Sequence, residues 1–221
     1  ADQTVECDGA GNTDALDAWL ASNGGASVTD DCGEVTWTND FEALTDDCGA
    51  TGSATVRFTA SDDCGNESTT TATFTIEDSE APVITLPEAD LAMECFDAAT
   101  VDAWIATATA TDNCSGDVEV SASYDAPETN CEQTVTVTFT ATDDCDNTAT
   151  STKTFIVNDD TPPENNCNDL TVYTNESGSY ELTQADIDAI TANITDNCTV
   201  QDEIEITVSQ QLFGCSDIGQ G

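Results

Sequence analysis

Acidic turns that carry a cysteine recur along the chain, and their side chains could bind a hard cation. The sequence Asp-Asp-Cys-Asp-Asn occupies 143–147, and a related turn, Asp-Asp-Cys-Gly-Asn, occupies 62–66. Asp-Asn-Cys occurs at 112–114 and again at 196–198. Carboxylate and amide oxygens are the ligands that Ca²⁺ prefers in proteins. The turns therefore indicate calcium binding if the fold gathers several of them.

The two Asp-Asp-Cys-x-Asn turns are predicted to connect the strands of β-hairpins. Apolar and polar residues alternate on both sides of 143–147, which is the pattern of half-buried strands. Residues 54–76 repeat this pattern, with Phe58, Cys64, Asn66 and Phe74 standing 81 residues before their counterparts. Four matches at one offset indicate an internal repeat of about 80 residues, close to the size of a small β-sandwich.

The predicted fold class is all-β, with tandem immunoglobulin-like β-sandwich repeats forming an elongated rod. Each repeat carries a short helical insert, expected near 14–20, 98–106 and 184–192 from the apolar spacing. Residues 1–80 form a first repeat without its first strand, 81–161 a complete second repeat, and 162–221 a third that stops before its final hairpin. Strands are also expected at 170–173 and 204–208. We expect the chain to be a window from a longer array.

The charge of the chain limits its partners. The sequence has 45 acidic residues against Arg57 and Lys153 and no histidine, for a formal net charge of −43. Nucleic acid is excluded as a partner, because phosphate binding needs clustered Lys and Arg. No apolar run of about 18 residues is present, so direct membrane insertion is not expected. The carboxylates are either a solvated acidic surface or, in the clustered minority, specific Ca²⁺ ligands.

An enzymatic activity is not expected. Without histidine, and with one lysine and one arginine, only a paired-carboxylate mechanism such as glycoside hydrolysis would be available. The acidic pairs recur with the repeat, which a catalytic pair would not do. Repetition favours a structural role for them.

Eleven cysteines without histidine or a C-x-x-C pair point to disulfides rather than zinc. Disulfides persist in oxidising surroundings, so we expect an extracellular or cell-surface protein. In each repeat one cysteine of an acidic turn, Cys32, Cys114 or Cys198, is followed by another after 16 or 17 residues, which suggests bonds within each repeat. The predicted pairs are Cys32–Cys48, Cys114–Cys131, Cys198–Cys215, Cys7–Cys64 and Cys95–Cys145, with Cys167 bonded to a cysteine beyond Gly221.

The turns and linkers resemble those of a known repeat family. Residues 59–66, Thr-Ala-Ser-Asp-Asp-Cys-Gly-Asn, the Thr-Asp-Asn-Cys sequences at 111–114 and 195–198, and Asp-Asp-Thr-Pro-Pro at 159–163 are similar to hyalin repeats and related immunoglobulin-like repeats. Such repeats occur in large surface proteins of Bacteroidota, including gliding-motility adhesins. The resemblance implies an immunoglobulin-like sandwich, secretion and an adhesive or stalk role. The helical insert and the cysteines at 7 and 95 depart from the family pattern.

An immunoglobulin-like sandwich would bring the acidic segments together at the repeat boundaries, because these turns lie at the same end as the incoming linker. The predicted structural Ca²⁺ ligands fall into three sets. The first boundary has Glu77, Asp78, Glu80, Asp112, Asn113, Asp143, Asp144 and Asn147. The second has Asn158, Asp159, Asp160, Asp196 and Asn197. A third set, facing a preceding repeat, has Asp30, Asp31, Asp62 and Asp63.

The favoured function is an extracellular structural or adhesive stalk, with calcium and the proline-containing linkers stiffening each boundary. Its expected partners are neighbouring repeats of the same chain or filament, and surface glycans are a further option. Two alternatives stay open. One is a filament subunit assembled by strand complementation between incomplete end domains. The other is a glycan- or cell-binding module.

Overall fold

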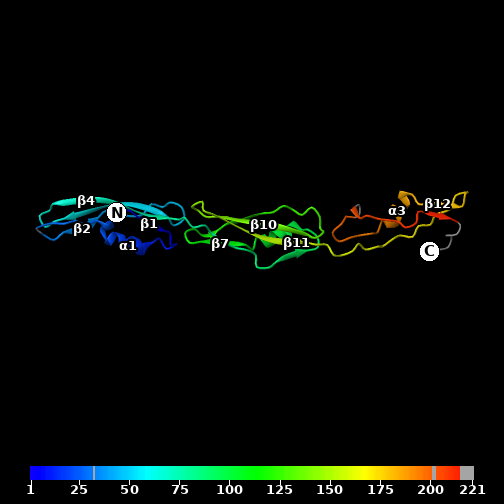
Figure 1. The fold of residues 1–221 in the computed structure, drawn as a ribbon, viewed down its shortest axis with the longest axis horizontal. Helices are drawn as coiled ribbons and strands as arrows, with labels where there is room; N and C mark the ends of the chain where they lie inside the picture. The colour runs from blue at the N-terminus through cyan, green and yellow to red at the C-terminus, as the bar shows by residue number, and fades with distance from the viewer. Residues whose placement is uncertain (32, 201–202, 215–221) are drawn as a thin grey trace. The chain divides into compact units, whose positions relative to one another are not determined.

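Long strands with alternating exposure dominate the fold, as the sequence pattern predicts. The structure is a computed structural model, and it describes residues 1–31, 33–200 and 203–214. Within these residues the chain is mostly β-structure with three short α-helices (Figure 1). The helices are α1 (Thr13–Ala21), α2 (Ala98–Ile105) and α3 (Gln184–Thr191), and a 3₁₀ turn covers Asn23–Gly25. Each α-helix lies at the position of a predicted insert.

The first repeat is built on one four-stranded sheet. Its order is β1-β4-β3-β2, from β1 (Gln3–Glu6), β4 (Glu67–Glu77), β3 (Gly52–Ser61) and β2 (Thr36–Asn39). Strands β3 and β4 form the predicted hairpin, in register from Gly52↔Ile76 to Ser61↔Glu67. Strand β1 runs parallel to the end of β4, which places Glu6 beside Glu77. The start of the chain therefore lies at the opposite end of β4 from the 62–66 turn.

The core of this repeat lies between the hairpin and α1. Phe58 and Phe74, at alternating strand positions, are fully buried. The Trp19 ring packs against both, with centroids 5.3 Å from Phe58 and 5.4 Å from Phe74. Trp19 is thus a core residue, and it anchors the helix to the sheet. Burial of three aromatic rings contributes several kcal/mol by area alone.

The second repeat uses the same hairpin, with two sheets assigned around it. One sheet has the order β6-β11-β10-β9 and the other β5-β7-β8. The Trp104 ring of α2 lies 6.2 Å from the Phe139 ring, edge to face, as Trp19 lies against Phe58. The strands are β5 (Val83–Thr85), β6 (Leu91–Met93), β7 (Thr109–Asp112), β8 (Gly116–Val118), β9 (Val120–Ser123), β10 (Gln133–Thr142) and β11 (Thr148–Val157).

The third repeat contains less regular structure than the other two. Helix α3 starts with a complete capping box, in which Thr183 and Asp186 each bond the other's backbone N–H. A short antiparallel pair joins β12 (Ser179–Glu181) to β13 (Leu212–Gly214). The predicted strands at 170–173 and 204–208 are wrong, because neither segment forms a ladder. Residues of a strand need a partner for their backbone groups, and the described part of this repeat offers these segments none.

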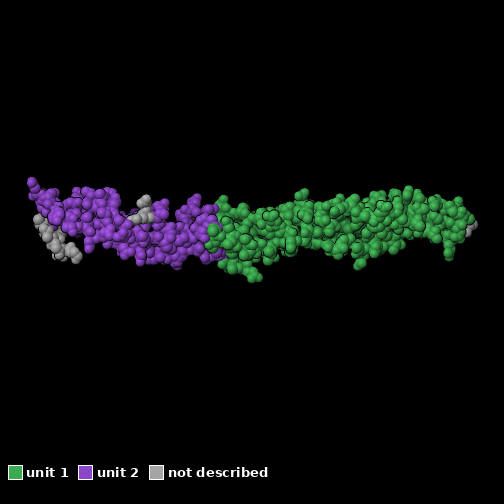
Figure 2. Space-filling view, turned by 180° about the vertical axis from the view of Figure 1, so that it is seen from behind, with its two compact units in different colours: residues 1–90, 99–125, 136–154 green, residues 91–98, 126–135, 155–221 purple. Residues whose placement is uncertain are grey.

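Two compact units are present when the chain is divided by its contacts (Figure 2). One comprises residues 1–90, 99–125 and 136–154, and the other residues 91–98, 126–135 and 155–221. The boundaries at 80 and 161 remain a division of the sequence, and the term repeat is used below in that sense. All contacts described below lie within one of the two units.

Candidate metal centre

Three of the predicted calcium ligands meet in space. Asp78 follows the end of β4, Asp112 ends β7, and Asp143 starts the turn between β10 and β11. One carboxylate oxygen from each lies within 4.8 Å of the other two. We refer to these three residues as the first acidic cluster. In the described part of the chain it is the only group of three or more acidic or cysteine side chains so arranged.

Short hydrogen bonds within each turn position these carboxylates. Asp143 Oδ1 accepts from the backbone N–H groups of Cys145 at 2.8 Å and Asn147 at 2.9 Å. Asp112 Oδ1 accepts from those of Cys114 at 2.8 Å and Ser115 at 2.9 Å. Aspartate followed by a short turn favours this bond, because its side chain reaches the backbone two residues on. The Asp-x-Cys spacing thus fixes the orientation of both carboxylates.

The linker is tied to the same place. Asp78 Oδ1 accepts from the backbone N–H of Glu80, and the Asn147 side-chain amide donates to the Asp78 carbonyl at 3.2 Å. Asp144 donates its backbone N–H to Ser115 Oγ at 3.1 Å, which joins the two turns. These bonds connect all three segments that carry the cluster.

The cluster leaves negative oxygens without a partner. Asp143 is only 6% exposed, and the Oδ2 atoms of Asp143 and Asp78 are buried and accept no hydrogen bond from any described residue. Burial raises the pKa of Asp78, and the charges of Asp112 and Asp143 raise it further. Each pair of charges at this spacing repels by about 3 kcal/mol at an effective dielectric constant of about 20.

No side chain of the protein can neutralise this charge. The sequence has one arginine, one lysine and no histidine. Arg57 pairs with Asp40 at 3.5 Å, and Lys153 pairs with Asp90 at 3.3 Å. A buried carboxyl group is stable when it is protonated, and an ionised one is stable only when it is paired or coordinates a metal. The oxygen donors fit a hard divalent cation such as Ca²⁺, which accepts carboxylates, backbone carbonyls and water together.

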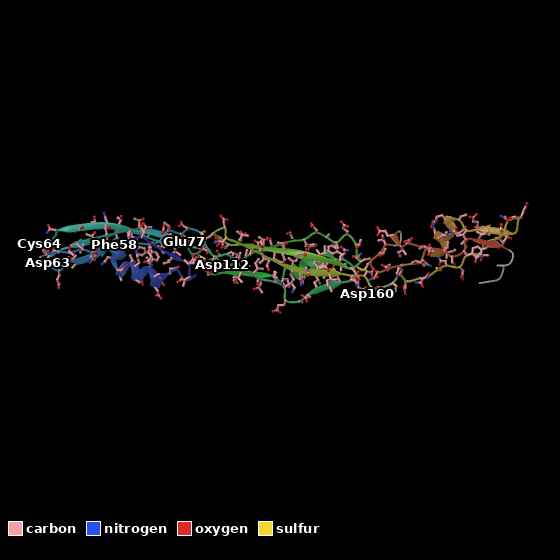
Figure 3. The ribbon with its side chains drawn as sticks, viewed as in Figure 1. Phe58, Asp63, Cys64, Glu77, Asp112 and Asp160 are labelled. Atoms are coloured by element: carbon pink, nitrogen blue, oxygen red, sulfur yellow. A yellow bond between two sulfur atoms is a disulfide. The ribbon has the colours of Figure 1, made fainter. Side chains whose placement is uncertain are left out.

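No described contact joins the other side chains predicted at this boundary to the carboxylates of the cluster. Glu77, Glu80 and Asp144 are exposed, and no described contact brings their carboxylates to the three aspartates. The Asn113 side chain donates to the Cys7 carbonyl at 2.6 Å and so braces the backbone instead. In Figure 3 Glu77 and Asp112 lie toward one end of the first repeat's sheet, and Asp63 and Cys64 lie at the other.

Sequence reasoning missed Glu6. Its carboxylate accepts from the backbone N–H and the hydroxyl of Ser79, at 2.8 and 2.9 Å, and its charge also raises the pKa of Asp78. The repeated dipeptide Glu-Cys, at 6–7 and 94–95, was the available signal. Glu94 plays the same part in the second repeat, where it accepts from Thr161 Oγ1 at 2.9 Å and from the Asn197 amide at 2.7 Å.

The ligands predicted at the second boundary are ordered in the same way but form no cluster of three. Asp159 Oδ1 accepts from the Thr161 N–H, and Asp196 Oδ1 accepts from those of Cys198 and Thr199 at 3.0 and 2.7 Å. These backbone bonds, led by that of Thr199, lower the pKa of Asp196. Asn158 Oδ1 accepts from the Glu132 N–H, and Asp160 is exposed.

The acidic residues predicted to face a preceding repeat lie at the free end of the first hairpin. Asp62 is half-buried and holds its turn as Asp143 does, with bonds to Cys64 and Asn66 at 2.8 Å, and its pKa is lowered mainly by the Asn66 side chain and backbone. Asp30, Asp31 and Asp63 are exposed. This set therefore remains a prediction.

The disulfides of the structure differ from the predicted pairs. Cys7 bonds Cys114, Cys48 bonds Cys145, and Cys95 bonds Cys198, with Cα atoms 5.6, 5.2 and 5.0 Å apart. Each bond joins one sequence repeat to the next instead of closing a repeat on itself. Three disulfides indicate an extracellular or secreted protein.

The predicted pairs are wrong because their cysteines lie at opposite ends of long strands. Cys7 follows β1, whose end pairs with Glu77, whereas Cys64 precedes Glu67. Ten strand residues separate these positions, or about 33 Å at 3.3 Å per residue. Disulfides need Cα atoms within about 7 Å. The same strand length separates Cys95 from Cys145 and Cys114 from Cys131.

The remaining predicted pairs fail or fall outside the described residues. Cys32–Cys48 and Cys198–Cys215 are wrong, because Cys48 and Cys198 bond other cysteines; Cys32 and Cys215 themselves lie outside the described part. Cys64, Cys131 and Cys167 are free and exposed. The predicted bond from Cys167 to a cysteine beyond Gly221 stays a prediction.

The comparisons with known proteins assign no family. No family model matches the chain, and no curated protein matches it. A solved structure of the protocadherin gamma B7 extracellular cadherin domains 1–4 aligns with 14% identity and a TM-score of 0.23. The alignment covers 48% of this chain and 32% of that one.

None of the described helices is long and apolar enough to cross a membrane.

Proposed function

We propose that this chain is a structural segment of an extracellular, adhesive stalk, in which tandem immunoglobulin-like repeats are joined by disulfides and stiffened by calcium. The observation that carries the proposal is the first acidic cluster, with its two buried and unpartnered carboxylate oxygens. The resemblance to hyalin repeats supports the same role. We propose a structural rather than a catalytic use of these carboxylates.

The cluster would use Ca²⁺ to connect three chain segments. Asp78 comes from the linker between the first two repeats, and Asp112 and Asp143 come from two turns of the second. A bound cation would convert their mutual repulsion into attraction, so that the linker is held against both turns. Neighbouring repeats are thus the main partners in this proposal, with surface glycans reached by other parts of the protein.

The disulfides change what metal removal should do. Cys7–Cys114 and Cys48–Cys145 each bond one of the two turns to the first repeat, two residues after a cluster aspartate. When calcium leaves, these covalent bonds would still limit how far the two turns can move from the first repeat. Calcium and disulfides would therefore act together, and loss of both should loosen the boundary far more than loss of either.

Small-angle X-ray scattering of the whole chain tests this proposal. We expect little change in the radius of gyration with chelator alone or with reductant alone, and a clear change with both. Circular dichroism should stay constant, because no described disulfide lies within a single repeat. Asp112→Asn should abolish the calcium effect in reductant, and Asp117→Asn, an exposed neighbour, should not. Curves independent of calcium in reductant would rule the proposal out.

A further inference from the structure

The third repeat has an open groove of mixed polarity where the first two repeats have a filled core. The groove has a volume of about 830 Å³ and lies beside α3. Apolar and polar side chains line it in equal number: Ile187, Ala192, Ile204, Ile206 and Val208, and Gln184, Asp188, Thr191, Thr207 and Gln211. Ile206 is 36% exposed. In the first repeat the corresponding helix face is covered by Phe58 and Phe74, both fully buried.

A free cysteine lies in the same unit, at a position that is bonded in the first repeat. Cys131 precedes β10 as Cys48 precedes β3, and Cys48 bonds Cys145 in the turn of the next repeat's hairpin. The first boundary has two disulfides, Cys7–Cys114 and Cys48–Cys145. The second boundary has a counterpart of the former, Cys95–Cys198. Cys131 itself is free and exposed.

Hydrogen bonds of the residue next to Cys131 hold this segment close to the linker and to the Asp196 turn. The adjacent Asn130 accepts from the Asp159 N–H at 2.7 Å and donates its side-chain amide to the Cys198 carbonyl at 3.5 Å. These contacts connect the segment of Cys131 to the linker and to the Asp196 turn. Asp159 and Asp196 correspond to Asp78 and Asp112, and a counterpart of Asp143 is missing from the described residues of this repeat.

We propose that this surface is a docking site for a β-hairpin of the β10–β11 type, with an Asp-Asp-Cys-x-Asn turn and an aromatic residue in each strand. The two aromatic side chains would fill the groove beside α3. The cysteine of the turn would bond Cys131, and its first aspartate would lie beside Asp159 and Asp196. The inference rests on the groove, the disulfide pattern and the turn, and it does not depend on calcium binding.

The occupant is a hairpin that is not already part of a folded repeat. Within the described chain both hairpins of this type, β3–β4 and β10–β11, have their phenylalanines fully buried in their own repeats. A second copy would have to give up one of these cores to supply the strands, and its own repeat would lose two buried aromatic rings. The covalent step is a thiol–disulfide exchange. The Cys131 thiolate attacks a mixed disulfide at the hairpin's cysteine, one S–S bond replaces another, and a small thiol leaves.

A synthetic peptide with the sequence of residues 134–157, carrying glutathione on its cysteine as a mixed disulfide, tests the proposal with the whole chain. We expect the peptide to bond Cys131 at least about tenfold faster than Cys64 or Cys167, which are also exposed, because docking raises its local concentration. Disulfide mapping by mass spectrometry identifies the site, and released glutathione gives the rate. The control peptide has alanine at the positions of Phe139 and Phe155, and its advantage at Cys131 should disappear.

Several results would overturn the proposal. One is equal reaction of the peptide at the free cysteines, and another is equal reaction of the alanine peptide. The third is formation of Cys131–Cys64 dimers by the chain alone in oxidised glutathione, which would assign the surface to a second copy. Because an isolated hairpin is only marginally stable, the same sequence fused after Gly221 provides a second measurement. Its cysteine should bond Cys131 in the fused chain, and a free Cys131 there would also contradict the proposal.

Discussion

The first and second repeat boundaries use the same parts, but only the first has all of them. Each has a glutamate before a cysteine, an aspartate in the linker and an Asp-Asn-Cys turn, and in each the cysteine bonds that turn. The first boundary adds the hairpin turn of 143–147, which contributes a third carboxylate and a second disulfide. At the second, the described residues contain no such turn, and Cys131 is free.

This difference shows that the hairpin turn has a different role from the linker and the Asp-Asn-Cys turn. The linker and the Asp-Asn-Cys turn are ordered by hydrogen bonds to their own backbone. Asp112 and Asp196 each accept from the backbone N–H groups two and three residues further on. The hairpin turn converts two ordered but separate carboxylates into a compact cluster with a buried charge. The strands of the same hairpin fill the core beside the helix, so the carboxylate cluster and the core depend on one element.

Removing the disulfide that only the first boundary has should give the largest effect. The double variant Cys48→Ala and Cys145→Ala opens a loop of 97 residues, and we expect the free energy of unfolding to fall by about 2–5 kcal/mol. Cys131→Ala, at the corresponding position of the second boundary, should stay within about 0.5 kcal/mol of the parent. Tryptophan fluorescence during denaturant unfolding measures both, and equal losses would show that the two boundaries are equivalent.

Calcium affinity should distinguish the boundaries next. Asp143→Asn keeps the Oδ1 acceptor for Cys145 and Asn147 but removes the buried charge, so we expect calcium binding to weaken by about 10- to 100-fold. Asp159→Asn removes the linker carboxylate of the second boundary and should leave the strongest site unchanged. Isothermal titration calorimetry compares the two. A larger loss for Asp159→Asn would place the main site at the second boundary.

The smallest effect is a difference in titration between one aspartate of each boundary, Asp78 and Asp196, in metal-free buffer. Burial and neighbouring charges raise the pKa of Asp78 above 3.8, so its ionised form opposes folding, and this penalty is relieved as the pH falls through the raised pKa. Backbone hydrogen bonds lower the pKa of Asp196 below 3.8, so its stabilisation is lost as the pH falls through the lowered pKa.

Carbon-detected NMR of the side-chain carboxyls should place the Asp78 midpoint above 3.8 and that of Asp196 below it. Saturating calcium should lower the Asp78 midpoint, because the cation favours the ionised form. Titration of both groups on the same side of 3.8 would show that burial at the first boundary is too slight to matter.

Much of the local structure was predictable from the chain. Alternation around Phe58, Phe74, Phe139 and Phe155 predicted both hairpins, and the spacing before Trp19 and Trp104 predicted the helices. The strands expected at 170–173 and 204–208 have the same local pattern, yet they form no ladder. An alternating pattern indicates which side chains would face the core. Whether the segment forms a strand depends on a partner strand for its backbone groups.

By itself, the sequence determined that the acidic turns recur, that their aspartates bond their own backbone, and that the protein has almost no basic side chains to neutralise them. These are properties of composition and of contacts a few residues apart. Tertiary structure alone decided that Asp78, Asp112 and Asp143 converge while Glu77 and Asp144 do not. It also decided that Cys7 and Cys48 bond the following repeat. The recurrence of the cysteines along the chain is compatible with bonds within and between repeats, and only the end of a strand at which each cysteine lies distinguishes them.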